Sequence, residues 1–131
     1  MTSDTNMTKQ ILNVGQCGPD HIHITQLLKD NFDVQVQLAE THDEAVLKLR
    51  NGEFDLVLLN RIYDATGTQG LDTLRVIKSD DATCGIPVML VSNYEEAQVS
   101  AVAEGALPGF GKSALADPVT VERLATVLGE S

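Results

Sequence analysis

Three residues that could take part in chemistry follow short hydrophobic stretches of this chain. They are Asn60, Ser92 and Lys112. A lysine ammonium, a serine hydroxyl and free backbone N–H groups can together hold an anion. A carboxylate oxygen can act as a nucleophile, whereas the neutral amide of Asn60 is a poor one. A carboxylate near Asn60 is Asp64, which lies further along a loop where a solvated turn residue is the ordinary role.

The elements that must position these residues alternate regularly along the chain. Thr41 with Glu44, and Asp117 with Pro118, provide start signals for two helices. Five strands and five helices in alternation need crossover connections, and hence a parallel sheet with helices on both faces. The sequence therefore predicts a flavodoxin-like, doubly wound α/β fold, which is a three-layer α/β/α sandwich around a five-stranded parallel sheet. Its ligand site lies beyond the carboxyl ends of the strands. Strands are predicted over 11–14, 33–38, 54–59, 86–91 and 106–110, and helices over 22–31, 41–50, 71–77, 94–104 and 119–128.

The composition favours one cytoplasmic domain. The chain has 131 residues, 43% of them hydrophobic, which is enough for a core. Nineteen acidic residues against nine basic ones give a net charge of −10, which opposes binding to nucleic acid or to anionic membranes. The polar residues 1–10 are predicted to form a disordered tail, and 11–129 a single domain. Cys17 and Cys84 are predicted at opposite edges of the sheet, too far apart for a disulfide.

The succession of segments resembles the receiver domain of bacterial response regulators, of the CheY-like type. The resemblance rests on Phe54–Asn60, Gly70–Leu74, Ile86–Ser92 and Glu104–Lys112, in this order. It implies the fold predicted above and a role in two-component or phosphorelay signal transduction. Receivers of this family carry a phosphorylated Asp after the third strand, and an acidic pair after the first strand that helps to hold Mg²⁺. They also carry a Ser or Thr after the fourth strand and a Lys after the fifth.

The resemblance also shows where this chain departs from the family. Ser92 and Lys112 match the retained positions, and Phe110 falls at the position of the aromatic switch residue. The phosphoacceptor position, however, holds Asn60, and the acidic pair is replaced by Gly15 and Gln16. Because carboxylates usually hold Mg²⁺, the metal site and the phosphorylation chemistry are predicted to be lost together. Neither a cofactor nor an enzymatic activity is expected.

Two arrangements of Lys112 remain open at this stage. In the first, its ammonium donates to the side-chain oxygen of Asn60; in the second, Lys112, Ser92 and backbone N–H groups hold an anion. Ser92 also suits a helix N-cap, and Phe110 a core position. No metal site is expected, because His21 and His23 are two residues apart on a helix and point to different sides.

These observations predict a stand-alone pseudo-receiver that acts through a protein partner without being phosphorylated. The resemblance places the partner surface on the fourth helix, fifth strand and fifth helix, with Tyr94, Val99 and Ala103 as candidates. A homodimer through the same region is implied by resemblance alone. Two alternatives stay open: a receiver phosphorylated at Asp64, and a binder of a small ligand or anion on a flavodoxin-like fold.

Overall fold

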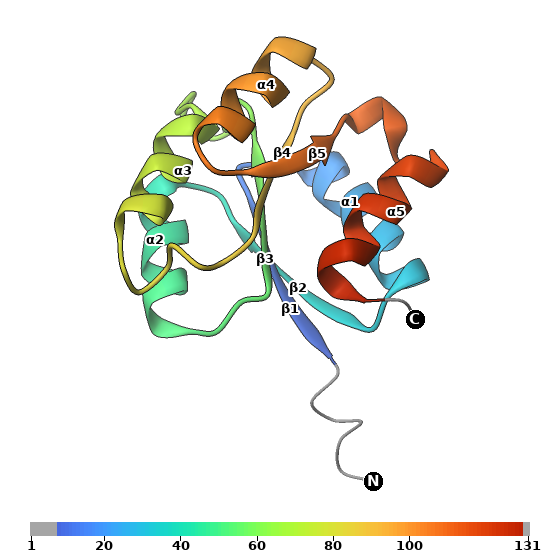
Figure 1. Ribbon diagram of the computed structural model, residues 1–131, viewed down its shortest axis with the longest axis horizontal. Coiled ribbons are helices and arrows are strands. Elements are labelled where there is room, and N and C mark those ends of the chain that lie inside the picture. Colours follow the sequence, from blue (N-terminus) through green and yellow to red (C-terminus); the bar gives the residue numbers. More distant parts are fainter. Residues whose placement is uncertain (1–7, 130–131) are drawn as a thin grey trace, which may run out of the picture.

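Five parallel strands form one sheet in the order β2-β1-β3-β4-β5, and helices cover both of its faces (Figure 1). The computed structural model describes residues 8–129. This is the flavodoxin-like, three-layer α/β fold that the sequence predicts. The elements are β1 (Lys9–Val14), α1 (Gly18–Asn31), β2 (Val34–Ala39), α2 (His42–Asn51), β3 (Leu56–Asn60), α3 (Gly70–Ser79), β4 (Val88–Val91), α4 (Glu95–Ala103), β5 (Leu107–Phe110), the short 3-10 helix η2 (Lys112–Ala114) and α5 (Pro118–Leu128).

The core consists of two hydrophobic clusters, one on each side of the sheet. Helices α1 and α5 close one cluster, and α2, α3 and α4 close the other (Figure 1). The central strand β3 contributes side chains to both clusters. Leu56 and Leu58 belong to the cluster closed by α1 and α5, and Val57 and Leu59 belong to the other. All five residues of β3 are buried, as expected for an uninterrupted apolar run in a parallel sheet.

The first strand begins earlier than predicted. Lys9 and Gln10, expected in the tail, belong to β1 and pair with β2. The Lys9 amide donates to the Asp33 carbonyl at 3.0 Å, and the Gln10 amide donates to an Asp55 carboxylate oxygen at 2.8 Å. Polar residues can extend a strand where the neighbouring strand satisfies their backbone groups. Residues 1–7 of the predicted tail lie outside the described residues.

The two helix start signals are confirmed. Thr41 Oγ1 accepts from the Glu44 amide at 3.1 Å at the start of α2, and Asp117 Oδ1 accepts from the Val119 amide at 2.9 Å at the start of α5. These contacts satisfy backbone N–H groups that the first turn of a helix leaves without partners.

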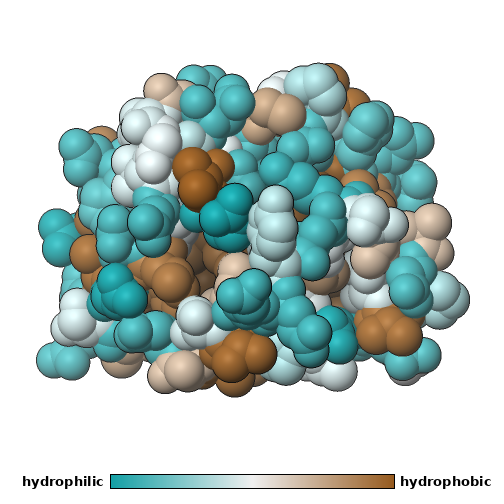
Figure 2. All heavy atoms as spheres, turned by 90° about the horizontal axis from the view of Figure 1, so that it is seen from above, coloured by the Kyte–Doolittle hydropathy of each residue, from teal (hydrophilic) through white to brown (hydrophobic). Residues whose placement is uncertain are grey.

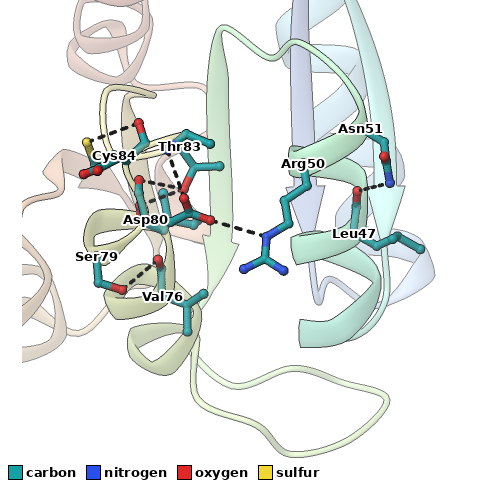
Figure 3. Close-up of polar contacts among 11 residues, drawn as sticks. Leu47, Arg50, Asn51, Val76, Ser79, Asp80, Thr83 and Cys84 are labelled. Atoms are coloured by element: carbon teal, nitrogen blue, oxygen red, sulfur yellow. Dashed lines mark hydrogen bonds and ion pairs between the residues drawn. The ribbon is translucent and has the colours of Figure 1, made fainter.

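The ends of α2 and α3 are joined on the side of the sheet away from the carboxyl ends of the strands (Figure 3). Arg50 Nε lies 3.3 Å from Asp80 Oδ2, and the Ala82 amide donates to the other oxygen of Asp80. The backbone hydrogen bond from Ala82, followed by the contacts with Arg50, lowers the pKa of Asp80. Cys84 is exposed in this loop, and both it and Cys17 are free thiols.

No helix of residues 8–129 is long and apolar enough to span a membrane.

Candidate functional site

A cavity of about 260 Å³ opens at the carboxyl ends of the strands. It brings together four of the residues singled out in the sequence, Asn60, Asp64, Ser92 and Lys112. The parallel sheet brings these residues together, because the carboxyl ends of its strands lie at the same edge. The remaining lining residues are Cys17, Asp20, Arg61, Ile62, Val91, Asn93 and Tyr94.

The amide of Asn60 is used as a hydrogen-bond donor. Its Nδ2 donates to the Gly15 carbonyl at 2.9 Å and to the Ile62 carbonyl at 2.7 Å. Both partners are carbonyl oxygens, so only an NH₂ group can face them. Asn60 is 7% exposed, and its side chain therefore ties the end of β1 to the loop after β3 in a largely buried setting. A carboxylate at this position could not make either bond.

The ring of Tyr63 occupies the space beside Gly15. By the resemblance to receiver domains, Gly15 is the residue at the first position of the acidic pair. Gly15 has a φ of +77°, and a Cβ added to it would lie 2.0 Å from Tyr63 Cδ1. The Asp64 amide also donates to the Gly15 carbonyl, at 3.0 Å, which brings the loop after β3 across the end of β1. A side chain at position 15 is therefore excluded both by the backbone conformation and by the tyrosine ring.

A chain of hydroxyl contacts connects Tyr63 to α2. Tyr63, 1% exposed, donates from its hydroxyl to Thr73 Oγ1 at 2.6 Å, and Thr73 Oγ1 lies 2.7 Å from His42 Nδ1. Burial raises the pKa of the Tyr63 hydroxyl far above its ordinary value, so it remains a donor. His42 is thus half-buried and hydrogen-bonded, which the sequence pattern of a helix first turn does not indicate.

Lys112 pairs with Asp20 of the first turn of α1. The Lys112 Nζ to Asp20 Oδ2 distance is 2.8 Å, and about a third of each side chain is exposed. Of the two arrangements left open for Lys112, the hydrogen bond to the Asn60 side chain is not the one in the structure, because the ammonium contacts a carboxylate of α1 instead. The hydrogen bond from Lys112 is the main cause that lowers the pKa of Asp20, while burial opposes it and a hydrogen bond from the Cys17 thiol assists.

Replacement of Lys112 by Met is expected to raise the pKa of Asp20 towards its ordinary value. Because folding lowers this pKa, the pair stabilises the fold above about pH 4, and this contribution is lost as the pH falls through the folded-state pKa. The pair is partly exposed, so we expect a loss of about 0.5–1 kcal/mol at neutral pH that becomes smaller at acid pH. NMR titration of Asp20 and denaturant unfolding at neutral and at acid pH measure this. The exposed Lys29→Met is the control, and equal effects of the two variants would contradict the prediction.

Ser92 and Asn93 organise the turn that leads from β4 into α4. Ser92 Oγ accepts from the Tyr94 amide at 3.1 Å and also lines the cavity. Ser92 is not the helix N-cap that its sequence position suggests, because α4 begins at Glu95 and Tyr94 holds the N-cap position. Asn93 Oδ1 accepts from both the amide and the hydroxyl of Ser113, each at 3.0 Å, and this fixes η2. The guanidinium of Arg61 lies 4.6 Å from the centre of the Tyr94 ring and covers it.

Phe110 lies in the core, and it does not line the cavity. It is 3% exposed and packs in the cluster closed by α1 and α5. A switch role for Phe110 stays a prediction. On the α4 side of β5 stands Gly109, where a Cβ would lie 2.1 Å from the Leu90 carbonyl oxygen.

Gln98 of α4 joins the last two strands beside Gly109. Its Nε2 donates to the carbonyls of Leu90 at 2.9 Å and Ser92 at 3.2 Å, and its Oε1 accepts from the Gly109 amide at 3.0 Å. The pairing of β4 with β5 shifts register at this point. The glutamine amide thus supplies hydrogen bonds to backbone groups where the strand pairing is irregular, and holds α4 against the sheet.

Gln98→Met is expected to lower the free energy of unfolding by about 1–3 kcal/mol, because it leaves partly buried backbone groups without partners. Denaturant unfolding measures the loss. Gln69→Met, at an exposed site, makes the same chemical change and should be close to neutral. A similarly small effect at Gln98 would contradict the bridging role.

The surface of α4, β5 and α5 carries exposed hydrophobic side chains. Tyr94 is 59% exposed and Val99 64%, and Ala103 is also exposed. A shallow cavity of about 410 Å³ runs beside Val99 between α4 and β5 and extends to Arg123. Figure 2 views the molecule from above, the side on which α4 lies in Figure 1, and shows mainly hydrophilic residues with separate hydrophobic groups.

Residues at the β1 end make no metal-binding cluster. Gln16 is 4% exposed, and neither atom of its side-chain amide has a hydrogen-bond partner within residues 8–129. His21 Nδ1 lies 3.1 Å from Asn13 Nδ2, and burial lowers the pKa of His21. In the described part of the chain, no three His, Cys, Asp or Glu side chains lie close enough to hold a metal ion.

Three important residues of this region were missed in the sequence: Asp20, Tyr63 and Gln98. Asp20 and Gln98 lie on helices, where polar residues are ordinary. Tyr63 lies three residues after the end of β3 and is one of two tyrosines in the sequence, but a lone aromatic residue in a loop does not reveal which glycine it will cover.

No family model matches the chain. Its structure, however, is similar to solved structures of receiver domains. The signal receiver domain of a DNA-binding response regulator from Colwellia psychrerythraea 34H is 24% identical with a TM-score of 0.77, over 93% of this chain and 99% of that one. The receiver domain of NtrX from Brucella abortus is 25% identical with a TM-score of 0.70, over 89% and 92%.

A further similar structure is the Mn²⁺-bound form of response regulator Rcp1, which is 20% identical with a TM-score of 0.65, over 79% of this chain and 78% of that one. Sheet order, helix placement and these likenesses agree. Residues 8–129 therefore have the flavodoxin-like fold of response-regulator receiver domains.

Proposed function

We propose that this chain is a pseudo-receiver, a signalling module that acts through a protein partner and whose state is set without phosphorylation. The observation that carries the proposal is the orientation of Asn60, whose NH₂ group donates to the carbonyls of Gly15 and Ile62. An amide is a poor nucleophile towards phosphorus, and here its nitrogen is already committed to two hydrogen bonds.

The residues at the cavity do not fit the Mg²⁺ ion that the receiver fold implies. Gly15 has no side chain, and the Tyr63 ring fills the space beside it. Of the two carboxylates that line the cavity, Asp20 is paired with Lys112, and Asp64 is exposed on the loop. Mg²⁺ dehydrates reluctantly and needs carboxylate oxygens in near-octahedral positions, and this donor set does not offer them.

The pair of Lys112 and Asp20 supports a second aspect of the proposal. A lysine ammonium that faced an empty pocket would favour a bound anion, but here an internal carboxylate lies 2.8 Å away. The pocket charge is thus balanced from within the chain. We therefore favour a pocket that holds one arrangement of the α1 start and η2 over one that binds a small anion.

We propose that the partner protein binds to the surface of α4, β5 and α5. The exposed Val99 and Tyr94 lie on it, and the Gln98 hydrogen bonds hold α4 in one position against β4 and β5. A fixed surface suits a module whose binding does not depend on a covalent signal.

Intact mass measured after incubation with acetyl phosphate, with and without Mg²⁺, tests the proposal. A receiver that is known to be phosphorylated serves as the positive control, and circular dichroism checks that the sample is folded. No mass change in this chain, beside a gain in the control, is the expected result. A Mg²⁺-dependent gain of one phosphoryl group that is lost in Asp64→Asn would establish the alternative acceptor and overturn the proposal.

A further inference from the structure

We infer that the outer edge of β2 is a binding site for an extended peptide segment that carries basic residues. This surface consists of the backbone groups of Val34, Val36 and Leu38 and the side chains around them, and we call it the β2 edge. It is separate from the cavity and from the surface of α4, β5 and α5, so the inference does not depend on the proposed function.

The printed register shows which backbone groups face outward. The Lys9 amide donates to the Asp33 carbonyl and the Gly15 amide to the Ala39 carbonyl. In a parallel ladder only alternate residues bond to a given neighbour. Odd-numbered residues of β2 therefore bond to β1, and the N–H and C=O groups of Val34, Val36 and Leu38 point away from the sheet.

Within residues 8–129, the two edges of the sheet differ in how they are protected. Edge strand β5 contains Pro108 and an irregular register, and its Gly109 bonds to Gln98 through its amide and to Arg123 through its carbonyl. Strand β2, with the sequence VQVQLA, is six residues long and has no charge, no proline and no register shift. Proteins usually block a strand edge with such devices, and a regular edge without them is suited to strand addition.

The charges around the β2 edge select the occupant. Exposed Asp33 and Glu40 stand at its two ends, and the whole chain carries a net charge of −10. Among the cations near it, Lys48 contacts Gln37 on the α2 side at 3.3 Å, and Lys9 lies in β1 in register with Val34. Antiparallel pairing of two copies around Val36 would place Asp33 of each copy opposite Ala39 of the other, with the acidic residues of both copies at the two ends of the shared ladder. Two chains that each carry a net charge of −10 also repel each other, so a basic partner segment fits better than a second copy.

The apolar side chains on this edge define the rest of the partner. Val36 and Leu38 are half-buried and lie on the α1 side of the sheet, whereas Gln35 and Gln37 are exposed on the other side. An added strand whose alternate residues are β-branched would cover Val36 and Leu38, and its polar residues would lie beside the glutamines. The partner is thus an extended segment of alternating apolar and polar residues with Lys or Arg at its ends.

The test uses the labelled peptide acetyl-Lys-Lys-Val-Thr-Val-Thr-Val-Lys-Lys-amide, with a version in which Glu replaces Lys as its control. We expect saturable binding by fluorescence anisotropy for the basic peptide only, weakened by added salt. Hydrogen exchange followed by NMR should show that the Val36 and Leu38 amides exchange rapidly in the free protein and become protected in the complex.

The matched variants are Val36→Pro and Val36→Thr. Proline removes the outward-pointing N–H group of position 36 and is tolerated on an edge strand, whereas threonine keeps both that N–H group and the branched shape. We expect about tenfold weaker binding for Val36→Pro and little change for Val36→Thr. Should the proline variant fail to fold, hydrogen exchange of the unmodified protein still decides the question.

Three results would overturn the inference. The first is equal binding of the basic peptide by Val36→Pro and by the unmodified protein. The second is a Val36 amide that is already protected in the free monomer, which would mean that another part of this chain covers the edge. The third is a dimer in sedimentation analysis whose Val36 amide is protected and which does not bind the peptide.

Discussion

Asn60→Asp is expected to destabilise the fold by about 2–4 kcal/mol at neutral pH, although it restores the residue type of a phosphoacceptor. The new carboxylate would stand where an NH₂ group now donates to the carbonyls of Gly15 and Ile62 at 2.9 and 2.7 Å. It would replace two hydrogen bonds by repulsion between oxygen atoms in a largely buried place. We also expect no Mg²⁺-dependent gain of mass with acetyl phosphate, because Gly15 and Gln16 remain.

The destabilisation should depend on pH in a defined direction. Repulsion by two carbonyl oxygens raises the folded-state pKa of the new carboxyl, and its neutral form can donate to one of them. A raised pKa means that the cost is smallest below the unfolded-state value of about 4 and grows as the pH rises through the folded-state value. Denaturant unfolding at several pH values measures this trend against the unmodified protein.

Asn93→Asp is the matched control for this variant. It makes the same chemical change at the same edge of the sheet. The Asn93 side chain, however, acts as a hydrogen-bond acceptor, because its Oδ1 accepts from the amide and the hydroxyl of Ser113. A carboxylate keeps both bonds, so we expect a change within about 0.5 kcal/mol. Equal effects at positions 60 and 93 would contradict the account of Asn60 as an obligatory donor.

Gly15→Ala is expected to lower the free energy of unfolding by about 3–4 kcal/mol. The added methyl group would lie 2.0 Å from Tyr63 Cδ1, and the backbone there has a φ of +77°. The first effect is overpacking of a buried ring, and the second is the ordinary strain of a non-glycine residue in the left-handed region.

Gly67→Ala separates these two effects. Gly67 has a φ of +74°, nearly the same as Gly15, but no atom lies within 4 Å of an added Cβ. Its substitution should cost about 1 kcal/mol, the strain alone. The difference between the two variants in denaturant unfolding measures the clash with Tyr63, and equal losses would show that the tyrosine does not restrict position 15.

A double substitution gives an independent check of the same contact. Tyr63→Ala alone should be costly because it empties a buried site. In its background, Gly15→Ala should cost about 1 kcal/mol, as at Gly67, since only the strain remains. Additive losses would contradict direct contact between the two residues.

Both predictions concern the same packed arrangement at the carboxyl ends of the strands. An acidic pair and a phosphoacceptor could not be introduced by changing one residue, because Tyr63 and two carbonyl oxygens occupy the positions that carboxylates would need. Asn60 and Gly15 therefore belong to one packed arrangement, in which each residue is suited to the contacts of the other.

The sequence by itself determined the order of strands and helices, and with it the edge at which the cavity forms. Local signals suffice for this: the apolar run Leu56–Leu59 suits a strand buried on both faces, and Thr41 and Asp117 satisfy the first amides of their helices. Crossover connections between parallel strands then leave few topologies. The residue types at positions 15 and 60 also led to the prediction that the phosphorylation chemistry is lost, and this stays a prediction.

Only the tertiary structure decided which side chains meet at that edge. Asp20 lies in the first turn of a helix, and nothing local indicates that it will pair with Lys112 from the far end of the chain. Tyr63 reaches Gly15 because the Asp64 amide bonds across to β1, and Gln98 bridges β4 and β5 because their register shifts. Periodicity reflects how a residue relates to its near neighbours, whereas these contacts depend on the paths of loops, which distant backbone hydrogen bonds determine.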